Sequence, residues 1–311
     1  MNPSHSPQSV SVVVPCYKSR ETLQVLVERI HGALDPLGID YEVVLVVDGS
    51  PDDTWEITRR LATHERVRGL NLMRNYGQHN AILAGILNAE NDLIVTMDDD
   101  LQHPPEAIPQ LIRALTDDLD LVYGVAKLEE HGFWRSLASK SVKSAMAITL
   151  GVEHARKISA FRVFRSELKM PFMEVRDAFV SLDVILSWVT TRIASIEIDM
   201  DRRTESESNY NVRSLFSHAL NMVTGYSTTP LKLVTMLGFA TALVGFGLLV
   251  VVLVLFFTGQ TEVAGFTTIA SMVALFAGAQ MTAIGILGEY LGRLHFRSMH
   301  RPTFVIRDEV K

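Results

Sequence analysis

The stretch Leu93–Pro105, LIVTMDDDLQHPP, decides the fold, because a largely apolar run ends in three consecutive aspartates. A short apolar run of this kind, 93–97, is typical of a strand buried on both faces of a sheet. Three carboxylates at its end repel one another unless a cation lies among them, and their hard oxygens suit Mg²⁺ or Mn²⁺. We predict a metal–diphosphate site at the carboxyl edge of an α/β sheet. The alternative is an acidic turn that only caps the next helix.

Apolar runs and helical patterns alternate on both sides of this stretch. We expect strands at 10–15, 41–47, 67–73, 93–97 and 121–125, with helices at 23–34, 55–61, 81–89 and 107–115 between them. Such alternation predicts βαβ units and a parallel sheet, whose ligands bind outside the carboxyl ends of the strands. Three of the expected strands end in polar clusters, namely 15–17, 48–50 and 98–100. Their coincidence favours a binding site over isolated turns.

The pattern after residue 125 is less regular. It predicts helices at 133–150 and 179–189, strands at 158–164 and 193–200, and a polar loop at 202–211. A short amphipathic helix is expected at 215–223, in the interface of a membrane.

Two long uncharged stretches, 233–261 and 263–288, hold most of the apolar excess of a chain that is 48% hydrophobic. Each is long enough to cross a hydrocarbon core of roughly 30 Å as a helix. Basic residues flank the pair, and the positive-inside rule then puts the N-terminal region and the tail in the cytoplasm. These residues are Arg213 and Lys232 before the pair, and Arg293, Arg297 and Arg301 after it.

Several classes of protein are excluded or disfavoured. The N-terminus lacks the charged and apolar regions of a signal peptide, and the single cysteine, Cys16, excludes an internal disulfide. The net charge of −6 gives no indication of nucleic-acid binding. Neither a G-x-G-x-x-G turn nor a P-loop is present, so carboxylates, a metal and side chains would have to hold a nucleotide.

The ordered motifs resemble the membrane-bound polyprenyl-phosphate glycosyltransferases of glycosyltransferase family 2, over nearly the whole chain. They are VVVPCYKSRETL, VVDGSPDDT, RNYGQHNAILAG, MDDDLQHPPE, SAFRVFR, SNYNVRSLFSHALNMVTGYSTTPLK and GEYLGRLHFRSMHRP. The resemblance implies a GT-A fold, a Rossmann-like α/β domain around a mostly parallel sheet. We expect a cytoplasmic catalytic domain at 1–210, juxtamembrane helices at 211–231, transmembrane helices at 232–258 and 263–291, and a cytoplasmic tail at 292–311.

The resemblance also assigns roles to residues of this chain. The metal-binding and catalytic positions are the D-x-D pair with the glutamine that follows it, Asp98, Asp100 and Gln102. The donor-binding positions are Pro15, Tyr17, Glu21 and Asp48 around the nucleobase, Arg74, Asn75, Gly77 and Gln78 in the donor pocket, and Asp99 in the variable place of the motif. For Asp48 a turn role stays open, and for 74–78 a helix start.

The acceptor of this group is a phosphate monoester, already anionic at neutral pH, so it needs cationic positioning more than a strong base. The candidates are Ser159, Arg162, Arg165 and Arg203, although a surface ion pair is an equal alternative for each arginine. Alternation along a strand puts Arg162 and Arg165 on opposite faces, so we do not expect both in the site. Asp183 lies near where some family members place a base, but a solvated helix face is the favoured interpretation.

These observations predict an inverting enzyme that uses Mg²⁺ or Mn²⁺ and moves one sugar from a UDP- or GDP-sugar, with UDP favoured. The acceptor would be polyprenyl (undecaprenyl) phosphate at the cytoplasmic face of the inner membrane. One alternative is transfer to a glycan or lipid-linked oligosaccharide, and another is a catalytically silent scaffold for a flippase complex. Membrane lipid is an expected partner, while a second copy of the chain and a flippase stay open.

Overall fold

The computed structural model describes residues 9–127, 158–174, 181–200, 228–259, 265–299 and 302–311. The chain divides into two compact units, which are described separately. The sheet unit comprises residues 1–210 together with 300–311, and the helical unit comprises residues 211–299.

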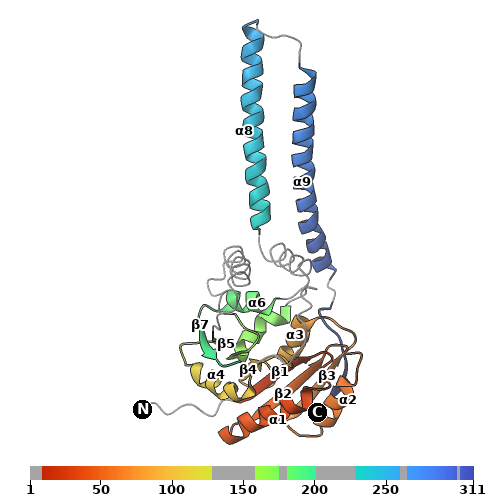
Figure 1. Cartoon of the computed structure of the whole chain (residues 1–311), viewed down its shortest axis with the longest axis vertical. Helices are drawn as coiled ribbons and strands as arrows, with labels where there is room; N and C mark the ends of the chain where they lie inside the picture. Colours follow the sequence, from red (N-terminus) through yellow and green to blue (C-terminus); the bar gives the residue numbers. More distant parts are fainter. Residues whose placement is uncertain (1–8, 128–157, 175–180, 201–227, 260–264, 300–301) are drawn as a thin grey trace. The chain divides into compact units, whose positions relative to one another are not determined.

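The sheet unit is built on one eight-stranded sheet with the order β7-β5-β6-β4-β1-β2-β3-β8 (Figure 1). The strands are β1 (Val10–Cys16), β2 (Tyr41–Val47), β3 (Val67–Leu72), β4 (Leu93–Thr96), β5 (Leu121–Ala126), β6 (Arg162–Arg165), β7 (Ile193–Ile198) and β8 (Ile306–Val310). Every residue of β1, β3 and β4 is buried, as expected for strands covered on both faces.

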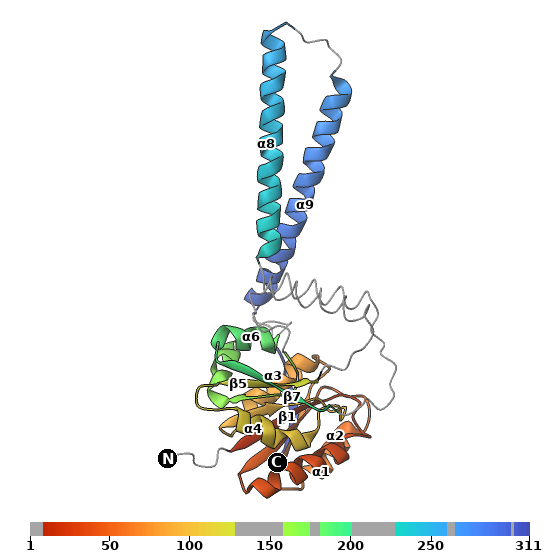
Figure 2. The ribbon, with the colours of Figure 1, turned by 60° about the vertical axis from the view of Figure 1, so that its left-hand side comes forward.

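Helices cover both faces of this sheet, as Figures 1 and 2 show. Alternation along β1 turns Val12 and Val14 toward one core and Val13 toward the other. The first core lies under α1 (Leu23–Leu34), α2 (Thr54–Leu61), the 3₁₀ turn η2 (Pro105–Ala107) and α4 (Ile108–Ala114). The second lies under α3 (Gln78–Asn88), the 3₁₀ segment η4 (Ser166–Glu174) and α6 (Leu182–Val189).

The order of the strands reverses beside β1. The chain runs from β1 to β2 and β3 on one side, and then returns to place β4 on the other side of β1. After β1 the chain continues to β2 on one side, and after β4 it continues to β5 on the other side, so the strand order reverses between β1 and β4. In open α/β sheets this topological switch point is where ligands bind.

The sheet is mixed, but the expectation of a mostly parallel sheet holds for four of the seven strand pairings among the described residues, including β5–β7. β1, β2, β3 and β4 are parallel, but β6 pairs antiparallel with β4 and β5, and β8 pairs antiparallel with β3. The βαβ rule that predicts parallel strands applies only where helix and strand alternate, and β6 and β8 lie outside that alternation. The predicted helices 133–150 and 215–223 lie outside the described residues.

Strand β8 comes from the end of the chain, which the sequence pattern predicts only as a tail. It closes the sheet edge beside β3, with Gly69 opposite Val310 and Asn71 opposite Asp308. A buried charge supports this docking, because Arg68 is only 9% exposed and its guanidinium contacts Glu309 at 2.6 Å and Glu90 at 2.9 Å.

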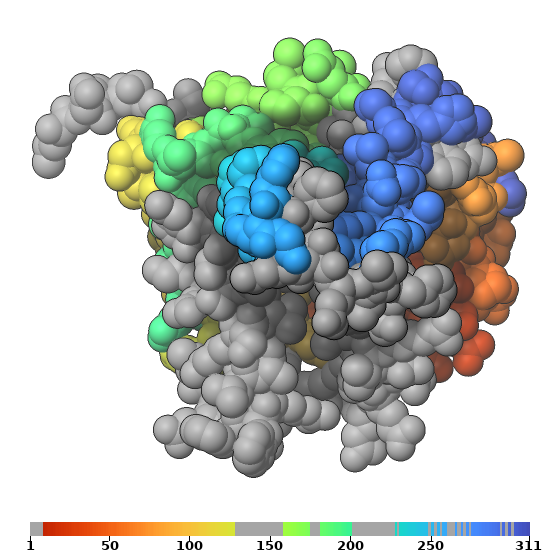
Figure 3. All heavy atoms as spheres, turned by 90° about the horizontal axis from the view of Figure 1, so that it is seen from above, coloured from red at the N-terminus to blue at the C-terminus, as the bar shows by residue number. Residues whose placement is uncertain are grey.

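The helical unit is a hairpin of α8 (Thr229–Phe257) and α9 (Phe266–Ser298), which lie side by side (Figures 1 and 3). Phe276 lies close to Gly245, where an added Cβ would be 3.2 Å from its ring. Among the described residues one window, Pro230–Gly247, is long and apolar enough to cross a membrane. The second predicted span stays a prediction, and α9 continues as a helix beyond its expected end.

Candidate functional site

The three aspartates occupy a tight turn directly after β4. Leu101 has a positive φ of 62°, a conformation that L-residues seldom adopt, and it folds the chain back on itself. The Gln102 amide donates to the Asp100 carboxylate at 3.1 Å, and the Asp98 amide donates to His103 Nδ1 at 3.2 Å. These bonds build a turn, and they do not cap a helix. The N-caps of η2 and α4 are Pro104 and Ala107, neither with a side-chain cap bond.

His103 has a structural position that the sequence pattern did not reveal. Its ring stacks on Phe161, with centroids 5.3 Å apart, and burial lowers its pKa. Because Nδ1 accepts the Asp98 amide hydrogen, the imidazole is neutral and locks the turn.

Asp98 and Asp100 form an electrostatically strained pair. Burial, and then the neighbouring Asp100 charge, raise the pKa of Asp98 to about 6, while Arg162 and a hydrogen bond from Gln78 act in the opposite direction. A cation bound between these two carboxylates would relieve both the desolvation and the repulsion.

The donor set fits a divalent cation of the Mg²⁺ or Mn²⁺ type. Within the described ranges, no group of three or more His, Cys, Asp or Glu side chains could hold a metal by itself. The turn thus supplies two carboxylates, and further ligands would have to come from amide oxygen, water or substrate. Mg²⁺ is bound in this way in many proteins, through one or two carboxylates plus the phosphates of its substrate.

The Asp99 carboxylate contacts the loop after β1. It accepts hydrogen bonds from the Ser19 hydroxyl and from the Tyr17 amide, the latter at 3.3 Å. Ser19 is buried and belongs to the loop after β1. Asp99 therefore ties the loop after β1 to the turn after β4, across the switch point.

A second network joins the loops after β1 and β2. The Lys18 amide donates to the Ser50 hydroxyl at 2.8 Å, and the Ser19 amide donates to the Thr54 hydroxyl at 3.0 Å. Both hydroxyls donate in turn to Asp52 Oδ1 at 2.6 Å. Lys18, with a φ of 58°, is the second described non-glycine residue in the left-handed region. The two described non-glycine residues at positive φ thus follow the neighbouring strands β1 and β4, and backbone strain of this kind often accompanies function.

Asp48 holds the segment 74–78 by its backbone. The residue is 3% exposed, and its two carboxylate oxygens accept the amides of Tyr76 at 2.7 Å and Gly77 at 2.8 Å. Burial raises the pKa of Asp48, and these two bonds oppose the shift. The carboxylate that the resemblance assigns to the nucleobase is thus engaged with the protein's own chain in this structure.

The segment 74–78 connects β3 to α3 and reaches the acidic turn. Gly77, with a φ of 90°, is the N-cap of α3, so the helix-start interpretation is confirmed. Gln78 donates from Nε2 to Asp98 Oδ1 at 2.6 Å. The guanidinium of Arg74 lies 4.7 Å from the centroid of the Tyr76 ring. The structure therefore brings the predicted donor-pocket segment to the predicted metal ligands.

The predicted nucleobase residues of the first loop differ in exposure. Pro15 is buried within β1, whereas Tyr17 is 45% exposed beyond its end. The Glu21 side chain is 82% exposed and pairs with Arg20 at 3.4 Å. Of these three, Tyr17 supplies an exposed aromatic ring, with the Lys18 ammonium 5.6 Å from its centroid.

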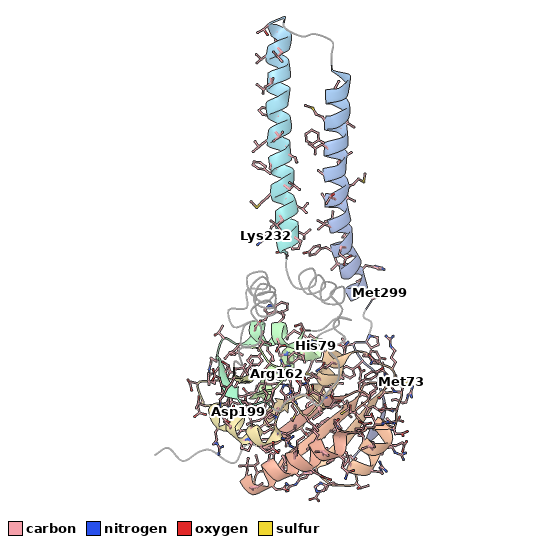
Figure 4. All side chains as sticks on the ribbon, in the orientation of Figure 1. Met73, His79, Arg162, Asp199, Lys232 and Met299 are labelled. Atoms are coloured by element: carbon pink, nitrogen blue, oxygen red, sulfur yellow. The ribbon has the colours of Figure 1, made fainter. Side chains whose placement is uncertain are left out.

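Arg162 lies at the carboxyl end of β4, the edge of the sheet that carries the acidic turn, but it is inside the protein (Figure 4). It is opposite Thr96 in the β4–β6 register and is 1% exposed. Its guanidinium donates to the Thr96 hydroxyl at 2.9 Å and forms an ion pair with Asp183, which also accepts from Tyr123 at 3.0 Å. This burial does not support Arg162 as an acceptor-phosphate ligand. Asp183 is a partner of a buried charge and does not lie on a solvated face.

The other acceptor candidates lie elsewhere. Arg165 is opposite Leu93, at the amino end of β4, and donates to the carbonyls of Thr116 and Leu119 at 3.1 Å. That end is a strand's length from Asp98, so the register corrects the prediction for Arg165. Ser159 lies in the chain just before β6, where its hydroxyl accepts the Phe161 amide at 3.2 Å. Arg203 lies outside the described residues.

Comparison with known proteins agrees with this geometry. Residues 11–168 match the family model described as "Glycosyl transferase family 2". The undecaprenyl-phosphate 4-deoxy-4-formamido-L-arabinose transferase of Edwardsiella ictaluri is 33% identical over 98% of this chain and 95% of its own length. The protein of the same name from Klebsiella pneumoniae is also 33% identical, over 98% and 94%.

A search of solved structures found similarity to glucosyl-3-phosphoglycerate synthase of Mycobacterium tuberculosis in complex with Mn²⁺ and UDP-glucose. The TM-score is 0.49 at 19% identity, over 72% of this chain and 83% of that one. The family model covers half of this chain, and the curated relatives cover nearly all of it. The chain therefore belongs to glycosyltransferase family 2, and it is a glycosyltransferase with the GT-A fold.

Proposed function

We propose that this enzyme transfers one sugar from a nucleotide-sugar donor to polyprenyl phosphate, with a divalent cation and with inversion, at the cytoplasmic face of the inner membrane. The observation that carries the proposal is the half-buried Asp98 beside Asp100 at the switch point of the sheet. The names of the relatives, undecaprenyl-phosphate sugar transferases aligned over nearly the whole chain, support the class of acceptor.

The donor side uses the loops that the hydrogen bonds tie together. Asp98 and Asp100 would hold Mg²⁺ or Mn²⁺, with Gln102 as the third proposed ligand. When bound, the ion neutralises charge on the departing nucleoside diphosphate. Tyr17 offers a ring on which a nucleobase can stack, and UDP remains the favoured nucleotide. Gln78 orients Asp98, while Asp99 holds the loop after β1, which carries Tyr17, against the acidic turn after β4.

The acceptor side needs little proton transfer. A phosphate monoester is an anionic nucleophile at neutral pH, so one direct displacement at the anomeric carbon is sufficient and inverts its configuration. Ser159, beside the carboxyl end of β4, and Arg203 remain the proposed acceptor-phosphate residues. The buried Arg162 contributes positive charge beneath the site and is paired with Asp183.

The membrane arrangement follows from chain connectivity. β8 pairs with β3, so the chain returns to the sheet unit after leaving α9. If α8 crosses the bilayer, α9 must therefore cross it back. The basic residues that flank the two helices then favour the cytoplasm for the sheet unit and β8.

The test is sugar transfer by the full-length protein in detergent. Undecaprenyl phosphate, Mn²⁺ or Mg²⁺ and a panel of labelled UDP- and GDP-sugars are supplied, and the lipid is extracted. We expect one donor to give a mono-glycosylated, acid-labile lipid, and Asp100→Asn to lower transfer by roughly 100-fold or more, as loss of a main electrostatic stabiliser does.

The matched control is Asp117→Asn, which neutralises a carboxylate that is 77% exposed on the sheet unit. This variant should transfer sugar like the wild type. Undiminished transfer by Asp100→Asn, or in excess chelator, would refute the metal role. Label found in polymer alone would indicate a glycan acceptor, and no turnover with every donor would indicate a scaffold.

A further inference from the structure

The predicted donor segment 74–78 is held from its N-terminal side by the end of the chain. Met73, the residue just before it, donates its amide to the Val305 carbonyl at 2.9 Å. Its own carbonyl accepts a hydrogen bond from the Arg307 guanidinium at 2.9 Å, and Arg307 Nε lies 3.5 Å from Met73 Sδ. Figure 4 labels Met73 at the margin of the sheet unit.

The strand that makes these contacts is firmly attached. Arg68 is 10% exposed in its side chain and would keep a poorly compensated charge if Glu309 left it. Asn71 donates to Asp308 at 3.2 Å, whereas the Lys311–Glu90 pair at 2.9 Å is exposed on both sides and adds little to the docking. Phe304 and Ile306 also pack against the core under α3.

Beyond Met73, contacts with other parts of the sheet unit hold the segment 74–78 in place. Gly49 has a φ of 57°, and an added Cβ there would lie 2.5 Å from the Asn75 nitrogen, so the two loops are in close contact. Asp48 holds the next two amides, and Gln78 ends the segment on Asp98. A continuous chain of contacts therefore leads from Arg307 to a proposed metal ligand.

We propose that β8 and Arg307 are positioning elements of the donor site. The strand that follows the second helix of the hairpin sets the position of 74–78, so donor affinity depends on its docking beside β3. Arg307 acts through Met73, since its guanidinium bonds the carbonyl that leads into the segment. This inference rests on the proposed function, in which 74–78 lines the donor pocket.

A positioning role also has a reciprocal consequence. If docking of β8 favours donor binding, then donor binding must favour docking of β8 by the same factor. Amide hydrogen exchange in β8 should therefore slow when UDP and Mn²⁺ are added. A strand that only stabilises the fold, without coupling to the segment, would show no such change.

The experiment compares Arg307→Ala, Arg307→Lys and Lys311→Ala in the full-length protein. Lys311→Ala is the matched control, because it removes a cation of the same tail that contacts Glu90 and not Met73. The measurements are the Kd for UDP with Mn²⁺, the donor KM and kcat, and the exchange rate of the β8 amides.

We expect Arg307→Ala to raise the Kd and the donor KM about fivefold, the net size of one ordinary hydrogen bond, with kcat retained at saturating donor. Arg307→Lys should restore part of the affinity, and Lys311→Ala should match the wild type. An unchanged Kd in Arg307→Ala, an equal loss in Lys311→Ala, or β8 exchange that ignores UDP would overturn the inference. A wild type that neither binds UDP nor transfers sugar refutes the proposed function, and the inference with it.

Discussion

Removing one partner of the Arg162–Asp183 pair should destabilise the sheet unit more than replacing both partners together. The Arg162 side chain is 2% exposed, and the Asp183 side chain is 17% exposed. Asp183→Leu removes the carboxylate and leaves the guanidinium with the uncharged hydroxyls of Thr96 and Tyr123 inside the core. Breaking a buried pair from one side costs about 3–5 kcal/mol of unfolding free energy.

Replacing the arginine of the pair is expected to cost less unfolding free energy than replacing the aspartate. Arg162→Met leaves Asp183 with its hydrogen bond from Tyr123 and with some access to water, so about 1.5–3 kcal/mol is lost. The double variant Arg162→Met/Asp183→Leu replaces both charges by apolar groups of similar length. Its cost should therefore fall well below the sum of the two single changes.

The assay is urea unfolding of the full-length protein in detergent, followed by tryptophan fluorescence. Trp55 in α2 and Trp188 in α6 report on the sheet unit. Arg165→Met is the control, since this arginine bonds carbonyls at the other end of β6 and is 21% exposed. Two outcomes would show that Arg162 is not a buried charge held by Asp183. One is a double variant whose loss of unfolding free energy equals the sum of the two single losses. The other is a loss below about 1 kcal/mol for Asp183→Leu.

Three further predictions concern other parts of the sheet unit. Gly49→Ala should weaken UDP binding and lower the unfolding midpoint, because its φ is positive and the new Cβ would meet the backbone of 74–75. The control is Gly38→Ala, which is also at positive φ but has open space around it. Equal UDP affinity in the two variants would contradict this prediction. The Cys16 thiol is 0% exposed and burial raises its pKa, so a thiol reagent should modify it only in urea; rapid labelling of the native protein would disprove its burial. Arg29 lowers the pKa of Glu106, so the pair contributes stability above the ordinary glutamate pKa and loses it as the pH falls through the lower folded-state value. Glu106→Gln should accordingly be less stable than the wild type by at most about 1 kcal/mol at pH 7, and the two should converge near pH 3; a constant difference would point to lost packing instead.

Much of the central sheet could be predicted from the sequence. β1, β2, β3 and β4 coincide with the expected apolar runs to within a residue or two, because strands covered on both faces need continuous apolar sequence. β6 overlaps the end of the strand expected at 158–164, but its antiparallel direction and its place between β4 and β5 could not be predicted from the sequence. β8 is largely charged and does not resemble a core strand, so the sequence indicates only a tail there.

The candidate site was predictable in composition but not in contacts. The sequence indicates that Asp98, Asp100 and Gln78 serve one site, and the structure brings Gln78 to Asp98. Nothing in the spacing shows that Asp99 bonds Ser19, or that Asp48 bonds the amides of Tyr76 and Gly77. Such bonds join residues tens of positions apart, and only the strand order makes them neighbours.

The sequence by itself determined the α/β alternation, the acidic turn after β4, the helices over the two long uncharged stretches, and the family. Each of these follows from local pattern: apolar periodicity, charge density and ordered motifs. Only the tertiary structure decided that Arg162 is buried against Asp183, that Arg165 lies at the wrong end of its strand, and that the chain returns as β8 beside Met73. These facts depend on strand order and register, which long-range packing selects and which local sequence does not encode.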